Sequence, residues 1–381
     1  MILSDELQEF RAEVRDFAQK EIAPGAEEID QTKEFPAEKV KKLAQRGFLG
    51  IMIPREYGGL GLSSMHYLIV MEELSAVCGS TALTYAAHNS LCLNPIFNFG
   101  NKAQIEKYVP TLASGEILGA FGLTEPEAGS DAGGTKTNFS ENGSNFVLNG
   151  SKCFITNGSV GGVLIVTARR TDATQPKDIS SFIVESKWPG FSVGKREDKM
   201  GLRASDTALL HFEDMKIPKD NLLGQEGEGF KQFLKILDAG RIGIGAMSVG
   251  MAQAAFDLAL KFAKERKQFN HPIADFQAIQ WKLADMATKI EASRNLVYQA
   301  AYLKDGGRPY TKEAAMAKLF SSETGREAIY QAMQILGGYG YMSSRPLERM
   351  FRDQKLCEIG EGTSEIQRIV IARHLLGKLK T

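Results

Sequence analysis

The sequence has little cysteine and no excess of charge of either sign. Its 381 residues include four cysteines, Cys78, Cys92, Cys153 and Cys357, which form no C-x-x-C motif and no Cys/His cluster. This spacing excludes the usual zinc and iron–sulfur sites, so we expect buried free thiols. Lysine plus arginine (46) balance aspartate plus glutamate (46). No global field therefore attracts nucleic acid or an anionic membrane.

Long apolar runs and targeting segments are also missing. No apolar run reaches the ~18–20 residues that cross a bilayer, and the first residues, MILSDELQEFRAE, lack a basic segment followed by an apolar one. We expect a cytoplasmic bacterial protein, or a mitochondrial matrix protein if the source is eukaryotic, with no membrane and no nucleic-acid partner. The 43% hydrophobic and 24% charged residues are typical of a globular protein, and the length allows two or three domains.

Helical patterns dominate the first part of the chain. Apolar residues recur at intervals of three and four over Ser4–Ile22, where Ser4 is a suitable N-cap and Pro24 prevents continuation. Pro36 stands where a first-turn proline belongs in a second helix, and helical spacing returns from His66 to about Val77. We therefore predict a mainly helical N-terminal region.

From about residue 117 the pattern changes to short runs rich in β-branched and aromatic residues. The runs are ILGAFGLT, NFVLNG, KCFITNG, VLIVTA, SSFIVE and TALLHFEDMKI. The intervals contain no long helical pattern, so an antiparallel barrel or sandwich is expected instead of a parallel dinucleotide-binding sheet. A nicotinamide dehydrogenase is therefore disfavoured.

Helical periodicity returns at Gly229 in four long segments. They cover about 229–266, 273–304, 311–336 and 364–379. Their lengths suit a four-helix bundle. The chain thus divides into a helical domain, a β-domain and a second helical domain, with predicted limits 1–116, 117–225 and 226–381.

Three stretches carry chemistry. FGLTEPEAGSDAGGTKT (121–137) leaves a strand and enters a loop of small residues and hydroxyls that a planar ring or a phosphate can approach, although a tight β-turn is the plainer interpretation of this loop alone. CFITNGS (153–159) places an aromatic residue beside a threonine. Glu361 stands between two glycines, which allow the backbone to bend a lone carboxylate into a cleft; a favourable negative charge at a helix start is the alternative.

With these motifs the sequence resembles the acyl-CoA dehydrogenase family from the first helix almost to the last residue. TEPEAGSDAGGTKT resembles the first family signature, and ILGGYGYMSSRPLERMFRDQKLCEIGEGTSEIQRIVIAR (335–373) resembles the second. The resemblance implies an α+β fold with an N-terminal helical domain, a middle antiparallel β-barrel domain and a C-terminal four-helix bundle. It also implies FAD in the cleft between the middle and C-terminal domains.

The resemblance carries over residue by residue. The positions it assigns to FAD binding are Phe121, Leu123, Thr124, Gly129, Ser130, Phe154, Thr156, Arg266, Gln268, Phe269, Gln334, Gly337, Gly338, Thr363 and Glu365. The positions it assigns to substrate binding are Tyr85, Ser130, Asp238, Arg241, Glu361 and Gly362. Because the arginine of the ERKQFNHP motif serves the FAD of a neighbouring subunit in the family, an oligomer is implied, expected to be a homotetramer built as a dimer of dimers.

Glu361 matches the catalytic base of the family. It would remove the α-proton of an acyl-CoA while the β-hydrogen passes as hydride to flavin N5, which gives a trans-2-enoyl-CoA. Some relatives carry their base one residue before Arg241, but Gly240 stands there in this chain and cannot compete. The DAGR segment at 238–241 is similar to the branch that acts on short and medium straight chains, as in the β-oxidation of fatty acids.

Partner and substrate leave alternatives open. Electron-transferring flavoprotein is the expected electron acceptor, and Glu197 is a weak candidate for its anchor because a glutamate in KREDK is usually a solvated charge. Tyr85 and His88 either line the acyl end or belong to the core. Branched, alicyclic or glutaryl-type acyl groups stay open. Rapid reoxidation by air would indicate an oxygen-using enzyme on this fold. A purified protein without flavin absorbance would indicate a non-catalytic acyl-CoA-binding protein.

Overall fold

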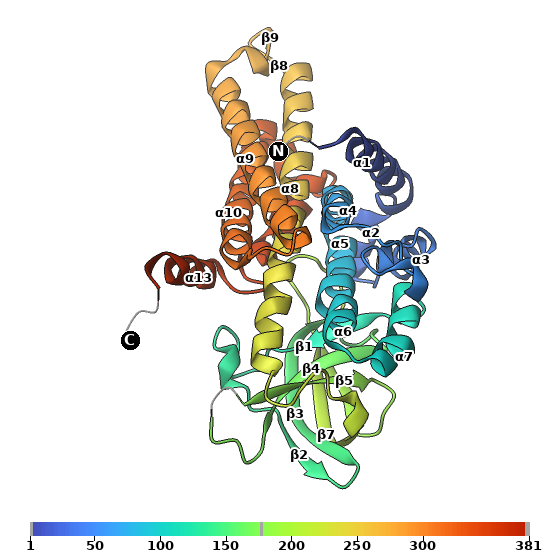
Figure 1. Ribbon diagram of the computed structural model, residues 1–381. Coiled ribbons are helices and arrows are strands. Elements are labelled where there is room, and N and C mark those ends of the chain that lie inside the picture. Colours follow the sequence, from blue (N-terminus) through green and yellow to red (C-terminus); the bar gives the residue numbers. More distant parts are fainter. Residues whose placement is uncertain (1–2, 176–177, 378–381) are drawn as a thin grey trace.

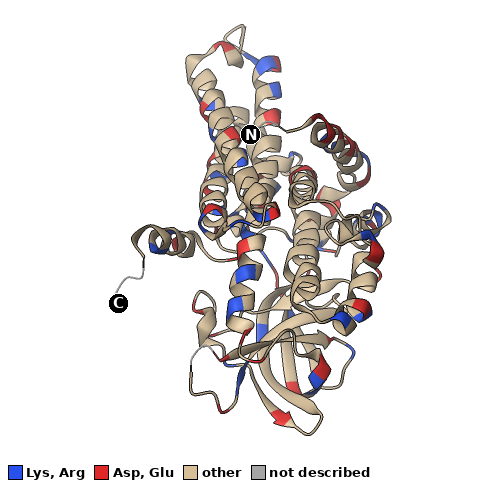
Figure 2. Ribbon diagram, in the orientation of Figure 1, with Lys and Arg blue, Asp and Glu red and all other residues tan. Residues whose placement is uncertain are grey.

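The computed structural model describes residues 3–175 and 178–377 and shows three regions. In Figure 1 a curled sheet occupies one end of the molecule, long helices extend from it to the other end, and the N-terminal helices lie along one side. Lysine, arginine, aspartate and glutamate are intermixed over all three regions (Figure 2), as the balanced composition predicts.

The N-terminal region is helical, as predicted. It comprises α1 (Asp5–Phe17), η1 (Ala18–Ile22), α2 (Ala26–Thr32), α3 (Ala37–Gln45), α4 (Ser64–Val77), α5 (Gly79–Ala86), η4 (Ala87–Leu93), α6 (Asn94–Phe99) and α7 (Lys102–Ala113), where η1 and η4 are π-helical. The predicted first helix is confirmed: the Ser4 hydroxyl accepts from Leu7 N (3.4 Å), and the helical turns end at Ile22, ahead of Pro24. Helix α4 is buried along almost its whole length because it packs between α1 and the long helix α8.

The middle region is a seven-stranded curled sheet. Its strands are β1 (Gly119–Gly122), β2 (Asn138–Asn142), β3 (Asn145–Thr156), β4 (Val163–Arg170), β5 (Ile179–Glu185), β6 (Phe191–Arg196) and β7 (Thr207–Pro218). The order is β1-β4-β2-β3-β7-β6, and β5 pairs with β4. The sequence patterns missed β2 and β6, and they divided the single strand β3 into two runs. In β6 Phe191 is half-buried and Val193 is exposed, and β2 is mostly polar, so neither strand shows a buried-strand pattern.

The antiparallel prediction for this sheet holds for most pairs but not for all. Strand β4 pairs in parallel with β1 and, through its last residues, with the start of β2. Strand β1 contacts η4, and the loop 123–137 follows β1 in the chain. Strands β2 and β3 come between β1 and β4 in sequence, so no hairpin joins β1 to β4. Strand β5 pairs with β4 and β6 with β7, but among the described residues no strand pairing joins β5 to β6, so the sheet curls without forming a complete barrel.

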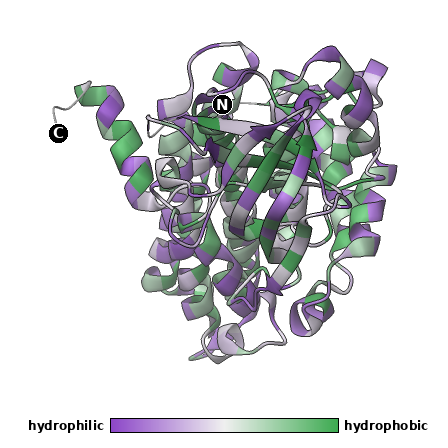
Figure 3. Ribbon diagram, turned by 90° about the horizontal axis from the view of Figure 1, so that it is seen from below, coloured by the Kyte–Doolittle hydropathy of each residue, from purple (hydrophilic) through white to green (hydrophobic). Residues whose placement is uncertain are grey.

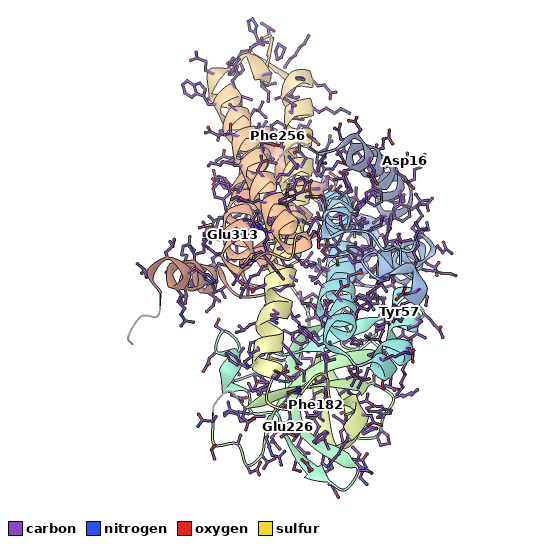
Figure 4. All side chains as sticks on the ribbon, in the orientation of Figure 1. Asp16, Tyr57, Phe182, Glu226, Phe256 and Glu313 are labelled. Carbon is purple, nitrogen blue, oxygen red and sulfur yellow. The ribbon has the colours of Figure 1, made fainter. Side chains whose placement is uncertain are left out.

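Aromatic side chains fill the inside of the curled sheet. Phe139, Phe146 and Phe182 meet edge to face, with ring centroids 4.9–5.5 Å apart, and Phe182 is labelled within the sheet in Figure 4. The strands seen in Figure 3 carry both hydrophobic and hydrophilic residues, as expected when one face packs inward. The sheet thus has a core of its own, separate from that of the helices.

The C-terminal region is helical, as predicted. Its elements are α8 (Gly229–Glu265), the hairpin strands β8 (Lys267–Gln268) and β9 (His271–Pro272), α9 (Gln277–Asp305), α10 (Thr311–Leu336), α11 (Gly338–Tyr341), α12 (Pro346–Gln354), the 3₁₀ helix η8 (Lys355–Glu358) and α13 (Ser364–Leu376). Helices α8, α9 and α10 pack together, and α13 extends away from them in Figure 1. Residues 378–379 of the predicted fourth helix lie outside the described residues.

Helix α8 combines two properties that the sequence analysis did not bring together. It is the one described helix long and apolar enough to cross a bilayer by length and composition, and most of its apolar window is buried inside the protein. Its glycines allow close approach, since a Cβ at Gly250 would stand 2.2 Å from Glu72 O of α4. These contacts make α8 the central helix of the fold. The four cysteines are buried and free, as predicted.

Candidate active site

Glu361 occupies a strained turn between η8 and α13. Its φ is 55° and that of Gly362 is 94°, so two successive residues adopt the left-handed region. That region is costly for a residue with a side chain, and such strain persists only where the surroundings enforce it. Thr363 then starts α13 as its N-cap, and its hydroxyl accepts from Ile366 N (3.4 Å). The turn therefore directs the Glu361 side chain back toward the helical core.

The Glu361 carboxylate lies directly against Gly240 of α8. A Cβ built on Gly240 would stand 1.8 Å from Oε2 and 2.8 Å from Oε1 of Glu361. Only a glycine therefore leaves room for the carboxylate at this point of α8. Oε2 is buried and finds no hydrogen-bond partner among residues 3–175 and 178–377, which marks it as an acceptor awaiting a proton or a ligand.

Three side chains hold the backbone of this turn. Lys318 Nζ donates to Gly362 O (2.8 Å), and Gln367 Nε2 donates to Gly362 O (2.8 Å) and Glu361 O (3.3 Å). Arg241 Nε donates to Glu361 O (3.4 Å). The turn is therefore fixed from α8, α10 and α13 together.

Arg241 is itself held by Asp238, one helical turn earlier. Its Nη1 lies 2.5 Å from Asp238 Oδ1, and the Thr311 hydroxyl donates to Asp238 Oδ2 (2.5 Å). Burial raises the pKa of Asp238, whereas the Thr311 hydrogen bond and the Arg241 charge lower it. Two residues predicted for substrate binding thus form one buried network beside Glu361.

Burial also raises the pKa of Glu361 to about 8, against the lowering effect of the Arg241 and Lys318 charges. A general base works best when its pKa lies near the working pH. An ordinary glutamate is a much weaker base, with a pKa of about 4.3. The environment of Glu361 therefore suits proton abstraction from a weakly acidic carbon.

A cleft of about 660 Å³ opens beside this network, between α4, α6, residues 235–242 of α8 and the segment 304–311 that leads from α9 to α10. Its walls include Tyr67, Ser90, Pro95, Phe97, Asp238, Ala239, Ile242, Tyr310 and Thr311, and Lys235, Lys304 and Arg308 lie along its lining. The volume suits a ligand of drug size or larger. The lining also includes the carboxylates Asp238 and Asp305, so three cations face two anions, and the apolar walls suit an elongated ligand with an apolar part and anionic groups.

Tyr67 lines the cleft beside α8, and Tyr85 packs against it. Their rings stack with centroids 5.2 Å apart, and Tyr85 OH reaches Tyr67 O at 3.5 Å. The Tyr67 hydroxyl faces Gly243, where a Cβ would stand 2.8 Å away. Tyr85 lies fully buried behind Tyr67. His88 is a core residue: its Nε2 lies 3.1 Å from Leu49 O, and its Nδ1 accepts from Gly119 N (3.0 Å).

The loop 121–137 is fastened at both ends by a buried ion pair. Glu125 accepts from Lys136 N (2.6 Å) and Thr137 N (3.1 Å), while Lys152 Nζ of β3 donates to Glu125 Oε1 (2.7 Å) and Leu123 O (3.0 Å). Burial raises the pKa of Glu125, but Lys152 and the backbone donors lower it further, so the net pKa is below the ordinary value. The carboxylate is thus stabilised in its charged form.

Lys152→Met should loosen this loop. Removing one partner of a buried ion pair leaves the other charge uncompensated, which costs about 3–5 kcal/mol, and the side chains of both residues are almost fully buried here. We expect a lower free energy of unfolding in urea and a lower affinity for any ligand that the loop binds. Lys216→Met, an exposed lysine of β7, is the control, and equal stability of the two variants would contradict the fastening role.

Phe154 projects from the sheet next to this loop. It has a φ of 58° and is 65% exposed, and it falls within the register shift between Lys152 and Ile155 where β3 bulges against β7. Bulges often turn a side chain toward a functional site. The bond from Cys153 N to Thr124 O (2.8 Å) brings Phe154 beside the start of the loop.

The predicted FAD-binding residues of the sheet are therefore brought together. Phe121 and Leu123 are buried, Thr124 and Thr156 are half-buried, and Gly129 and Ser130 are exposed. Within the described chain nothing comes within 4 Å of a Cβ built on Gly129, so that stretch is open. An uncovered aromatic face flanked by threonine hydroxyls and an open glycine loop fits the ring of FAD.

Six of the other predicted FAD-binding residues lie at the opposite end of α8. Arg266, Gln268 and Phe269 form the β8–β9 hairpin, where the Arg266 guanidinium stacks on the Tyr339 ring (5.8 Å) in the segment after Gln334, Gly337 and Gly338. The 37 residues of α8 separate this group from the sheet by about 55 Å at 1.5 Å per residue. Figure 4 labels Glu226, which precedes the helix at its sheet end, and Phe256 in its hairpin half. Within one chain the two groups do not meet.

The sequence patterns missed several residues of the site. Lys318 and Gln367 hold the Glu361 turn, Thr311 supports Asp238, and Tyr67 faces α8. A signal was present for Lys318, because a lysine between Ala317 and Ser321 interrupts a stripe of small residues on α10. Thr363 and Glu365, predicted for the cofactor, start α13, and Glu365 is exposed.

Comparisons with known proteins agree with this geometry. Models of the acyl-CoA dehydrogenase N-terminal, middle and C-terminal domains match residues 4–116, 120–215 and 227–376. The chain is 54% identical to a probable acyl-CoA dehydrogenase of Bacillus subtilis over 98% of its length and 99% of the relative. It is 48% identical to the mitochondrial short-chain specific acyl-CoA dehydrogenase of Bos taurus over 97% of its length and 90% of the relative.

Solved structures share the whole fold. Butyryl-CoA dehydrogenase from Megasphaera elsdenii superposes with a TM-score of 0.96 at 44% identity and 99% coverage of both chains. A chain from the structure of the electron transferring flavoprotein of Acidaminococcus fermentans gives a TM-score of 0.97 at 47% identity, covering 99% of this chain and 100% of that one. The chain therefore belongs to the acyl-CoA dehydrogenase family and is an FAD-dependent oxidoreductase that acts on acyl-CoA.

Proposed function

We propose that Glu361 is the base that removes the α-proton of a short-chain acyl-CoA. The single observation that carries this proposal is the carboxylate of the half-buried Glu361, whose buried Oε2 lies against Gly240 and has no hydrogen-bond partner among the described residues. Its raised pKa of about 8 strengthens it as a base. A carboxylate in water is too weak for this proton, so the closed surroundings are part of its function.

The chain's own residues then handle the charge that develops on the substrate. As the α-proton leaves, negative charge gathers on the thioester oxygen, and we assign the Glu361 backbone N–H as its donor. The bond from Arg241 to Glu361 O and those from Gln367 keep the peptide groups of this turn in a fixed orientation. Preorganised donors cost no rearrangement during the reaction. FAD, when bound, supplies the acceptor for the β-hydride.

The cleft beside Asp238 suits the CoA part of the substrate. Lys235 and Arg308 line it and offer positive charge to phosphate groups, and an arginine can donate to phosphate in a bidentate manner. Asp238 and Arg241 border the thioester end in this arrangement, and Gly362 follows the base. Ser130, on the exposed part of its loop, approaches from the sheet side.

Tyr67 supports a short acyl group. Gly240 and Gly243 lie one turn apart on the same face of α8, the first against the base and the second against the Tyr67 hydroxyl. Three residues rise about 4.5 Å along a helix, which leaves room for few carbons between the base and the tyrosine. Tyr85 supports Tyr67 from behind. The curated relatives named above include a short-chain specific enzyme.

The separation of the two FAD-binding groups supports a shared site. Phe121, Leu123, Thr124, Gly129, Ser130, Phe154 and Thr156 hold the ring end, and Arg266, Gln268, Phe269, Gln334, Gly337 and Gly338 at the far end of α8 serve a neighbouring chain. Thr363 and Glu365 complete the set at the start of α13. A homotetramer built as a dimer of dimers, with domain limits 1–116, 117–225 and 226–381, is the assembly that we propose.

Electron-transferring flavoprotein is the proposed acceptor, in line with the flavoprotein-linked structural neighbour. Glu197, the candidate anchor, pairs with Lys195 (2.9 Å) and is only partly exposed. The cytoplasmic location stays a sequence-based prediction.

Anaerobic titration of the oxidised protein with acyl-CoA thioesters tests this function. We expect loss of the flavin band to be fastest with C4 and to weaken as the chain lengthens, because Tyr67 closes the acyl space. Branched, alicyclic and glutaryl thioesters belong in the same panel. No bleaching by any thioester would contradict the assignment. Reoxidation by air as fast as by electron-transferring flavoprotein would favour the oxygen-using alternative.

A further inference from the structure

Lys318 is a fully buried lysine that no predicted role explains. It lies on α10 with an exposed fraction of 0%, and its Nζ donates to Gly362 O (2.8 Å). Burying an ammonium group is costly unless it meets a partner. Burial lowers the pKa of Lys318 to about 8, while the nearby Cys357 and Glu361 raise it. The hydrogen bond to Gly362 O, in the Glu361 turn, offsets part of the free-energy cost of burying this cation.

The contact falls on the peptide group that follows the base. Glu361 and Gly362 both have positive φ, so the turn is not held by helical hydrogen bonds of its own. Lys318 and Gln367 donate to the same oxygen, Gly362 O, each at 2.8 Å. A neutral donor and a charged donor therefore share one task of fixing the turn.

Charged and titratable groups surround Glu361 from four elements: Arg241 on α8, Lys318 on α10, Tyr67 on α4 and Cys357 on η8. The Arg241 charge is largely offset by Asp238 at 2.5 Å. Within the described parts of the chain, no carboxylate lies within ion-pair distance of Lys318. Lys318 is thus the cation beside the base whose charge is not already neutralised.

We propose that Lys318 is a positioning residue for the dehydrogenation, which fixes the peptide after Glu361 and keeps a positive charge beside the carboxylate. This inference rests on the proposed role of Glu361 as the base. The hydrogen bond keeps the carboxylate aimed at the substrate. The positive charge stabilises the ionised carboxylate before the reaction. This attraction is lost when Glu361 takes up the α-proton and becomes neutral.

Two variants separate these effects. Lys318→Met removes the hydrogen bond and the charge, whereas Gln367→Leu removes a bond to the same oxygen and no charge. We expect both to lower the rate of flavin reduction about tenfold or more, since small misplacements of a reacting group cost up to about 10²-fold. Only Lys318→Met should move the acid limb of the pH profile of kcat/KM to higher pH, because the pKa of Glu361 rises when the cation is lost.

Matched controls exclude a general effect of losing a buried lysine. Lys39 of α3 in the N-terminal region is also buried and donates to backbone carbonyls, Ile22 O (2.8 Å) and Pro24 O. Lys39→Met should leave the pH profile unchanged. Lys318→Arg, which keeps the charge, should restore the parent position of the acid limb even if the rate recovers only in part. Should Lys318→Met fail to fold, Lys318→Gln replaces it in every comparison.

A second readout does not depend on turnover. Because the folded state raises the pKa of Glu361 above its unfolded value of about 4.3, stability falls as pH rises from that value to about 8, and this contribution levels off above 8. In Lys318→Met the fall of Tm with pH should extend to higher pH, and Glu361→Gln should remove that extension. Coincident pH profiles and Tm curves of Lys318→Met and Gln367→Leu would overturn the inference. Parent activity in Glu361→Gln would instead overturn the proposed function.

Discussion

Glu361→Gln is expected to bind FAD and acyl-CoA but to lose flavin reduction by a factor of about 10²–10⁴, the usual contribution of a general base. The amide has nearly the shape of the carboxylate and can occupy the same space against Gly240. It cannot take up a proton. Stopped-flow loss of the flavin band under anaerobic conditions measures the effect, and the spectral shift on adding a substrate analogue shows that binding survives.

The pH dependence gives the same experiment a second result. The base must be ionised to act, and its pKa in the free enzyme is raised to about 8 by burial. The kcat/KM of the parent enzyme should therefore rise with pH up to about 8 and then level off. Residual activity in Glu361→Gln should lack this limb. Glu323→Gln is the control, because Glu323 pairs with Arg368 of α13 (2.6 Å) outside the site. An unchanged limb in Glu361→Gln would exclude Glu361 as the base.

Gly240→Ala is expected to leave the fold intact and to disable the reaction. The new methyl group would stand 1.8 Å from Glu361 Oε2, and the flexible end of the glutamate must move away. Alanine also suits a helix interior better than glycine, by about 1 kcal/mol. A base displaced by about 1 Å can lose about 10²-fold in rate. We therefore expect an unchanged or higher Tm together with a loss of flavin reduction of about 10²-fold or more.

Gly245→Ala on the same helix is the matched control. Its added Cβ would meet Val297 Cγ2 at 3.0 Å and Ser321 Oγ at 3.2 Å, and none of its nearest neighbours belongs to the site. The helix gains the same backbone stiffness there, so activity should stay near that of the parent. Equal activity in the two alanine variants would show that the contact between Gly240 and Glu361 is unimportant for the reaction.

Much of the fold could be predicted from local patterns. Period and capping predicted α1, α8, α9 and α10 within a few residues, since long amphipathic segments with Ser, Pro or Gly at their ends leave few alternatives. The parallel pairs of β4 could not be predicted from local patterns, because strand direction depends on how η4 and the loop 123–137 route the chain. Strand β6 was missed because its side chains are mostly exposed.

The site divides in the same way. Glu361 could be singled out from its flanking glycines and the family signature, and Gly240 from its place before Arg241. That these two residues touch is a property of three dimensions, as 121 positions separate them in sequence. Lys318, Gln367 and Tyr67 reach the site from helices whose periodicity indicates only a buried face. Sequence patterns identify buried faces, but they do not specify which atoms meet there.

The overlap of Gly240 with the carboxylate has an evolutionary consequence. A side chain at position 240 and the Glu361 carboxylate would occupy the same small volume, so only one of the two positions can place a side chain there. An acidic residue can enter that volume from the long helix or from the turn before the last helix, but not from both at once. The two positions should therefore covary, and a proton acceptor can change its place in the chain while its location in space is conserved.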